Sequence, residues 1–197
     1  IYSYSENKSY QLTREGGIYL QDPWAPDGEK LIFASKRSEA RNLWIINADG
    51  TNEKQLTHLI KKGDTIISAS WSPDGKYLYF ASAPILWDDR NKLVPERYRE
   101  VKYDMLRVRY DIESDSWGES EVVLSSEETG LSITHPRVSP DGRFILFCMS
   151  KYGYFNLYHP SSDLYMLDLK TNNYKRLEIN SDQPESWHSW SSNGRWI

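Results

Sequence analysis

Two histidines, His135 and His188, are the residues of this chain best suited to chemistry, and each stands near the start of an expected β-strand. Imidazole is the commonest protein ligand for metal ions, and Gln183 lies close to His188 in the sequence. A metal site needs three or four converging ligands, however, and only these two histidines can be nominated. The sequence therefore favours structural roles for both, and we predict neither a metal nor any other cofactor.

Local structure explains the other candidates for catalysis. Aspartate recurs in one motif as Asp27, Asp74 and Asp141, but the fourth copy has Asn193, which cannot act as an acid. Cys148, the single cysteine, lies in an apolar run and is predicted to be buried rather than reactive. The chain has no Gly-x-Ser-x-Gly elbow, no His-Glu-x-x-His pair and no phosphate-binding glycine loop. We predict no catalytic residue.

Composition argues against two classes of partner. The chain has 197 residues, of which 39% are hydrophobic and 26% charged, and this is typical of a folded globular protein. A formal net charge of −4 without a basic stripe argues against nucleic-acid binding. No apolar run approaches the ~20 residues of a membrane-spanning helix, so no membrane span is expected in this segment.

A turn of the Pro-Asp-Gly type recurs four times and organises the chain. The copies are Trp24-Ala25-Pro26-Asp27-Gly28, Trp71-Ser72-Pro73-Asp74-Gly75, Val138-Ser139-Pro140-Asp141-Gly142 and Trp190-Ser191-Ser192-Asn193-Gly194. Proline fixes φ at the second turn position, and glycine takes the left-handed position that closes the turn. Apolar residues alternate after each glycine, so each copy predicts a β-hairpin with one buried face. Trp24, Trp71 and Trp190 share one repeat position with Val138 and are predicted to pack in the core.

A second kind of hairpin alternates with the first. Residues 1–13, 45–57 and 166–178 align without gaps around a polar turn, and a looser copy runs from 106 to 124. Two hairpins per unit give four strands. The shortest spacing between successive turn glycines is close to the ~40–45 residues of a four-stranded propeller blade.

The two motifs together carry a family resemblance. Trp-Ser-Pro-Asp-Gly-Lys at 71–76, followed by an apolar strand, and Lys-Gln-Leu-Thr at 54–57 resemble the TolB-type, WD-repeat-like propeller repeat. The resemblance covers nearly the whole chain outside two insertions. It implies an all-β β-propeller of four-stranded antiparallel blades, and a bacterial setting in the periplasm or at the cell surface.

The repeat divides the chain into about three full blades with a partial blade at each end. The expected boundaries are 1–13 for the end of a preceding blade, 18–57, 65–125 and 132–178 for three blades, and 186–197 for the start of the next. A strand that stops at 197 would leave an unpaired apolar edge, so we expect a fragment of a propeller with about six to eight blades. The alternative is a closed four-bladed ring in which 1–13 completes the last blade.

Two insertions interrupt the repeat, at 84–104 and at 151–162, each between the second and third strands of its blade. Successive strands run antiparallel, so both insertions should lie on the face that carries the crossovers between blades. The first strand of each blade lines the central channel in propellers that resemble this one, and its first residues should open onto that face. The candidate ligand-binding residues there are Trp187, His188, His135, Arg137, Trp87, Tyr154 and Tyr158.

Trp187 differs from the core tryptophans because it shares its repeat position with the polar residues His135, Ser68 and Gln21. This favours a contact role. We therefore expect a non-catalytic binding module with a protein or carbohydrate ligand. The resemblance leaves two alternatives open: the gating propeller of a serine peptidase of the prolyl-oligopeptidase or tricorn type, and a metal-dependent polysaccharide lyase similar to oligogalacturonate lyases.

Overall fold

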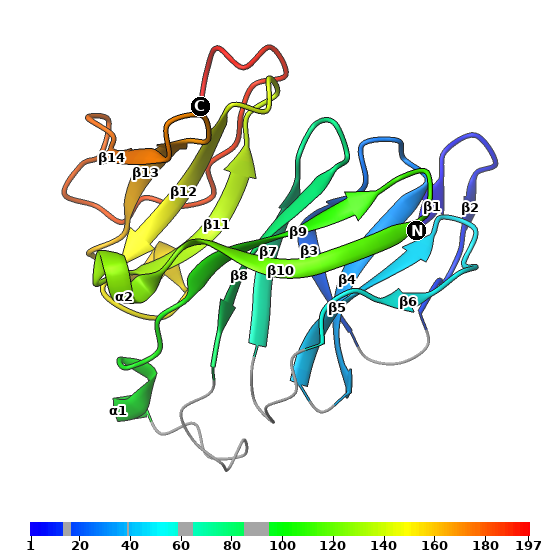
Figure 1. Cartoon of the computed structure of the whole chain (residues 1–197), viewed down its shortest axis with the longest axis horizontal. Helices are drawn as coiled ribbons and strands as arrows, with labels where there is room; N and C mark the ends of the chain where they lie inside the picture. The colour runs from blue at the N-terminus through cyan, green and yellow to red at the C-terminus, as the bar shows by residue number, and fades with distance from the viewer. Residues whose placement is uncertain (14–16, 39, 59–64, 85–94) are drawn as a thin grey trace.

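The computed structural model describes residues 1–13, 17–38, 40–58, 65–84 and 95–197, and these residues form mainly β-structure (Figure 1). The strands are β1 (Tyr2–Ser3), β2 (Lys8–Ser9), β3 (Gly17–Trp24), β4 (Lys30–Ser38), β5 (Ala40–Asn47), β6 (Lys54–Gln55), β7 (Thr65–Trp71), β8 (Tyr77–Ala83), β9 (Asp104–Asp111), β10 (Ser116–Leu124), β11 (Ser132–Val138), β12 (Phe144–Ser150), β13 (Asp163–Asp168) and β14 (Asn173–Arg176). Three short helical segments accompany them: α1 (Pro95–Tyr98), α2 (Ser126–Thr129) and η1 (Asn156–Tyr158). None of the described helices is long and apolar enough to cross a membrane.

The strands pair as blades. Antiparallel pairing joins β3, β4, β5 and β6 in order, then β7 to β10, then β11 to β14, while β1 and β2 form a separate hairpin. One parallel pair, Arg41 of β5 with Thr65 of β7, joins two neighbouring blades. The first strands of successive blades also contact each other, β3 with β7 and β7 with β11. The described chain is therefore a series of four-stranded blades arranged around their first strands, and we number them blade 1 (β3–β6), blade 2 (β7–β10) and blade 3 (β11–β14).

The repeated turns form as their sequence predicts. In blade 2, Asp74 accepts hydrogen bonds from the Ser72 hydroxyl at 2.6 Å and from the Lys76 backbone N–H at 3.1 Å. Asp141 accepts the same pair of bonds in blade 3, where Ser139 provides the hydroxyl. These aspartates close turns, which supports the structural explanation of the recurring carboxylates.

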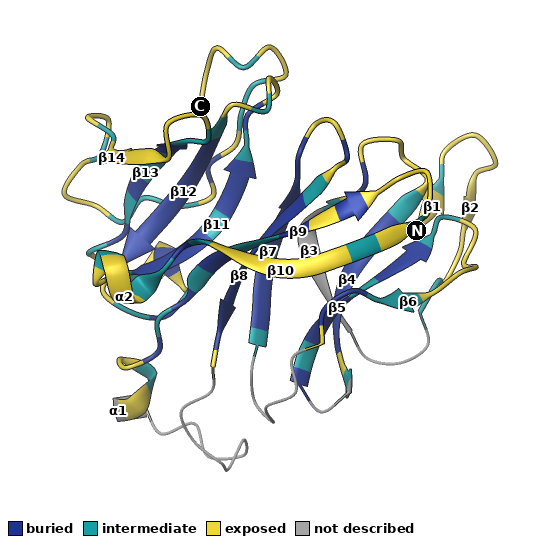
Figure 2. Cartoon of the chain, viewed as in Figure 1, coloured by how far each residue is buried: buried dark blue, intermediate teal, exposed yellow. Residues whose placement is uncertain are grey.

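Burial decreases outward along blades 2 and 3, as Figure 2 shows. Leu78 and Phe80 of β8, and Ile145 and Phe147 of β12, are at most 1% exposed. The outermost strands β10 and β14 are mostly exposed. The core therefore lies between blades, over their inner strands.

The tryptophans of the repeated turn do not share one environment. Trp71 is 8% exposed and packs against Tyr110 and Trp117, with ring centroids 5.9 and 5.6 Å away. Trp190 is half-buried. Trp24 is 42% exposed, so the prediction that it packs in the core is wrong. An equivalent repeat position guarantees the turn but not a neighbour that covers the indole.

The segment 177–197 contains no strand, although the sequence predicts the start of another blade at 186–197. Its turn nevertheless closes, because the Gly194 N–H donates to the Ser191 carbonyl at 2.9 Å. The side chains of His188 and Trp190 donate to backbone carbonyls of β11 and β12. Side-chain hydrogen bonds thus hold this segment on blade 3, where the sequence predicts the first strand of a further blade.

Candidate functional site

The two insertions contact each other. The Tyr154 N–H donates to the hydroxyl of Tyr98 at 3.1 Å, and the Gly153 N–H donates to the Val101 carbonyl at 2.7 Å. The first insertion, 84–104, thus contacts the second, 151–162, although more than 50 residues separate Tyr98 from Tyr154. Trp87, one of the predicted ligand-binding residues, lies outside the described residues.

Aromatic rings fill the junction between the insertions. Tyr98 and Tyr152 meet edge to face at 5.9 Å, and Tyr103 and Tyr154 meet in the same way at 5.8 Å. Tyr154 also lies 4.0 Å from the ring of Phe155. Tyr103 is 3% exposed, and burial raises its pKa far above the ordinary value. The half-buried Tyr154, which the sequence suggested as a ligand contact, is therefore part of the junction.

A buried polar network holds the second insertion on blade 3. Asn156 is 1% exposed, and its Oδ1 accepts a hydrogen bond from the Thr134 hydroxyl of β11 at 2.9 Å. Its Nδ2 donates to the Ser162 hydroxyl at 2.8 Å, and that hydroxyl donates to the Glu185 carbonyl at 2.7 Å. The Asn156 side chain thus connects β11 to the end of the insertion at Ser162, which in turn bonds to the C-terminal segment.

The inward position of Asn156 leaves its apolar neighbours in solvent. Phe155, Leu157 and Tyr158 are 56%, 50% and 79% exposed. We call these three residues the apolar ridge. The sequence suggested only Tyr158 of the three, because nothing local to the insertion shows that the asparagine between them points inward.

The His188 side chain is buried and hydrogen-bonded to the backbone of blade 3 and does not face solvent. Its side chain is 8% exposed, and Nε2 lies 2.8 Å from the His135 carbonyl and 3.2 Å from the Leu146 carbonyl. A carbonyl only accepts, so Nε2 carries the proton, and Nδ1 faces the Cys148 sulfur at 3.5 Å. Both nitrogens thus contact groups within the protein, and the Nδ1 lone pair faces the Cys148 thiol. Among the described residues, no group of three His, Cys, Asp or Glu side chains could hold a metal ion.

The neighbours of His188 are also buried. Cys148 is 0% exposed, as predicted, and burial raises the pKa of its thiol to about 12. Arg137 is 6% exposed, with Nη1 3.5 Å from the Ala69 carbonyl of the adjacent first strand. Of the predicted site residues at the start of the first strands, His135 is half-buried and Trp187 is 60% exposed, with ring centroids 6.1 Å apart.

Acidification is expected to destabilise the chain through these histidines. Burial lowers the pKa of His135 and of His188 to about 4, and the charge of Arg137 acts in the same direction. Between pH 6.5 and 4 the unfolded chain therefore binds more protons than the folded one. The free energy of unfolding decreases as the pH is lowered, by about 2 kcal/mol per histidine at pH 5. Melting temperatures from pH 7 to 5 should fall steeply for the parent and less steeply for His188→Gln. An unchanged slope in that variant would contradict the assignment.

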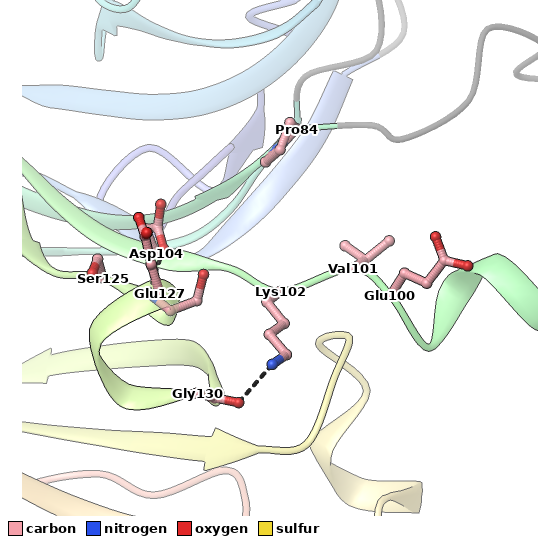
Figure 3. A pocket seen from close by; sticks show the side chains of 9 residues that line it. Pro84, Glu100, Val101, Lys102, Asp104, Ser125, Glu127 and Gly130 are labelled. Carbon is pink, nitrogen blue, oxygen red and sulfur yellow. Dashed lines mark hydrogen bonds between the residues drawn. The ribbon is translucent and has the colours of Figure 1, made fainter.

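A pocket of about 450 Å³ opens on the same side of blade 2, between the first insertion and α2. Figure 3 shows Lys102 extending to the end of α2, where its Nζ donates to the Gly130 carbonyl at 2.7 Å. Asp104 accepts from the Ser126 N–H at 2.6 Å. The lysine and this aspartate are thus engaged in joining the two walls of the pocket, which the sequence did not predict.

Comparison with known proteins identifies the fold. No family model matches the chain, and no curated protein matches it. Among solved structures, putative TolB from Agrobacterium tumefaciens has a TM-score of 0.58 at 20% identity, covering 84% of this chain and 50% of its own. TolB from Acinetobacter baumannii also has a TM-score of 0.58, at 18% identity, covering 87% of this chain and 34% of its own.

An oligogalacturonate lyase in complex with manganese has a TM-score of 0.55 at 17% identity, covering 98% of this chain and 47% of its own. The chain thus spans half or less of the length of these structures. The predicted fold class is confirmed: the chain has the TolB-like β-propeller fold, and a fragment of a larger propeller fits the comparison.

Proposed function

We propose that this propeller segment is a non-catalytic protein-binding module that engages its partner through the apolar ridge, Phe155, Leu157 and Tyr158. The observation that carries the proposal is the exposure of three large apolar side chains on a segment that a buried asparagine holds in place. Exposed apolar groups of this kind are characteristic of interaction sites. The resemblance to TolB-type repeats favours a periplasmic or cell-surface setting.

The rigidity of the ridge supports binding. Aromatic side chains dominate the energy of protein interfaces, particularly where their backbone is already ordered before the partner arrives. The ridge meets this condition because the His159 N–H donates to the Asn156 carbonyl at 3.0 Å, and the Asn156 side chain is bonded at both ends. A partner therefore meets an ordered surface and not a flexible loop.

Lyase chemistry of the kind named for the manganese-bound neighbour has no support at the histidines. His188 directs its protonated nitrogen at two carbonyls and its other nitrogen at a thiol. Among the described residues, no group of three His, Cys, Asp or Glu side chains could complete a metal site around it. Binding without catalysis is the function that this geometry favours.

Polar substitution of the ridge is expected to abolish partner binding. The triple variant Phe155→Ser, Leu157→Ser and Tyr158→Ser should weaken binding by about 100-fold or more, because truncated interface aromatics commonly cost at least ~2 kcal/mol. Proteins captured from the source organism by the parent and by the variant should be compared by mass spectrometry. The affinity of each ridge-dependent protein is then measured with purified components.

A matched control replaces exposed apolar residues elsewhere, Tyr4, Ile112 and Val122, with serine. This control should retain every partner that the parent captures. If the control loses the same partners, or if no captured protein depends on the ridge, the proposed function is wrong.

A further inference from the structure

Three residues at one repeat position have left-handed backbone conformations. Their φ angles are +39° at Ser68, +54° at His135 and +57° at Trp187. Ser68 lies where the β7–β8 register shifts, and His135 lies where the β11–β12 register shifts. β-Bulges of this type turn a side chain away from the direction that the regular strand would give it.

The residue types at these bulges are not those that the backbone alone would select. Glycine occupies the left-handed position of all four repeated turns, at Gly28, Gly75, Gly142 and Gly194. At the two bulges the chain instead has a serine and a histidine in the left-handed conformation, and at Trp187 it has a tryptophan. Strain of this kind persists where the surrounding structure enforces it, and it is frequent at ligand sites.

The three left-handed residues form one contiguous row. The His135 N–H donates to the Ser68 hydroxyl at 3.2 Å, and the His135 and Trp187 rings are 6.1 Å apart at an angle of 50°. The His188 imidazole fixes the His135 carbonyl from the other side. The row therefore runs from the middle of β7 through the middle of β11 to the C-terminal segment.

The chemistry of the row suits a neutral ligand with hydroxyl groups. Trp187 is 60% exposed and offers a flat apolar surface. His135 is uncharged at neutral pH, because burial lowers its pKa to about 4. Its Nδ1 is buried and has no hydrogen-bond partner among the described residues. A ligand hydroxyl that bonded to this atom would relieve the cost of an unpaired polar atom.

We propose that Ser68, His135 and Trp187 form a binding subsite for a neutral saccharide, whose ring packs on the indole and whose hydroxyls bond to the histidine and serine. Carbohydrate recognition combines an apolar ring face with polar groups at its edge, and the row provides both without a formal charge. The subsite shares no residue with the apolar ridge and does not depend on the proposed protein-binding function.

The test uses maltotriose, cellotriose and triacetylchitotriose as neutral probes, with trigalacturonate as the acidic comparison. Binding to the full chain is measured by calorimetry, and the indole N–H signal of Trp187 is followed by NMR. At least one neutral probe should bind and shift that signal. Trp187→Gly and His135→Ala should each weaken its binding by about tenfold or more, as expected for the loss of a central contact.

Trp187→Gly also separates binding from structure. Glycine relieves the left-handed φ at this exposed position, so the melting temperature of the variant should not fall below that of the parent. The ridge triple variant should bind the saccharide as the parent does. The proposal is overturned if none of the neutral probes binds, if trigalacturonate binds more tightly than all of them, or if Trp187→Gly leaves binding unchanged.

Discussion

Replacing Gly153 with alanine should separate the two insertions and lower the free energy of unfolding by about 2–4 kcal/mol. A Cβ atom at this position would overlap the ring and hydroxyl of Tyr98, and the backbone φ of +69° is itself unfavourable for alanine. The Tyr98 ring cannot simply move away, because it packs on Tyr152 and its hydroxyl accepts from the Tyr154 N–H. Chemical denaturation of parent and variant measures the difference.

Gly28→Ala is the matched control for this experiment. Its φ of +73° is almost the same, but an added Cβ would meet nothing within 4 Å. The control therefore includes the backbone penalty without the overlap, and it should cost only about 1 kcal/mol. Adding Tyr98→Ala to Gly153→Ala should recover part of the loss, because the two effects share one contact. Equal destabilisation by Gly153→Ala and Gly28→Ala would show that the insertions do not depend on this contact.

Asn156→Ala should destabilise the chain by about 2–5 kcal/mol and disorder the apolar ridge. The substitution leaves the Thr134 hydroxyl without its acceptor and removes the donor to Ser162, and an unsatisfied buried group costs about 1–3 kcal/mol. Thr134 and Ser162 are each at most 1% exposed, so water cannot easily take the place of the amide. Thermal melting measures the stability loss, and binding of a ridge-dependent partner measures the functional loss.

The double variant Thr134→Val with Asn156→Ala provides the internal control for this network. Valine removes the hydroxyl that Asn156→Ala leaves unpaired, so the double variant should be less destabilised than the sum of the two single variants. Additive losses would mean that the Thr134 and Asn156 side chains are not coupled. A melting temperature of Asn156→Ala equal to that of the parent would refute the structural role of the network.

Several features of the site could not be read from the sequence. Trp187, His135 and Tyr158 were predicted as candidates because they depart from the repeat. The roles of Gly153 and Asn156 depend on contacts with Tyr98 and Thr134, which lie far away in the chain. An isolated glycine or asparagine in a loop carries no signal of such a partner.

The histidines show the same limit. The sequence predicts His135 and His188 near the start of first strands. In the structure, the His188 side chain donates a hydrogen bond to the His135 backbone carbonyl. Whether an imidazole faces solvent or a carbonyl depends on the register of the strands around it. The left-handed φ angles of the bulges are also set by pairing between strands, so the shared repeat position alone did not reveal them.

The sequence by itself determined the hairpins and the fold class, because proline, aspartate and glycine act on the few residues of their own turn and the alternation of apolar residues acts on a single strand. The tertiary structure alone decided which polar groups are buried, which tryptophan is covered and which insertion residues are exposed. These properties depend on the approach of residues 20 to 60 positions apart, as in Thr134 with Asn156 and Tyr98 with Tyr154. The sequence favoured structural roles for the two histidines, and the packing of blade 3 decided the form of that role by making His188 a hydrogen-bonded link between strands.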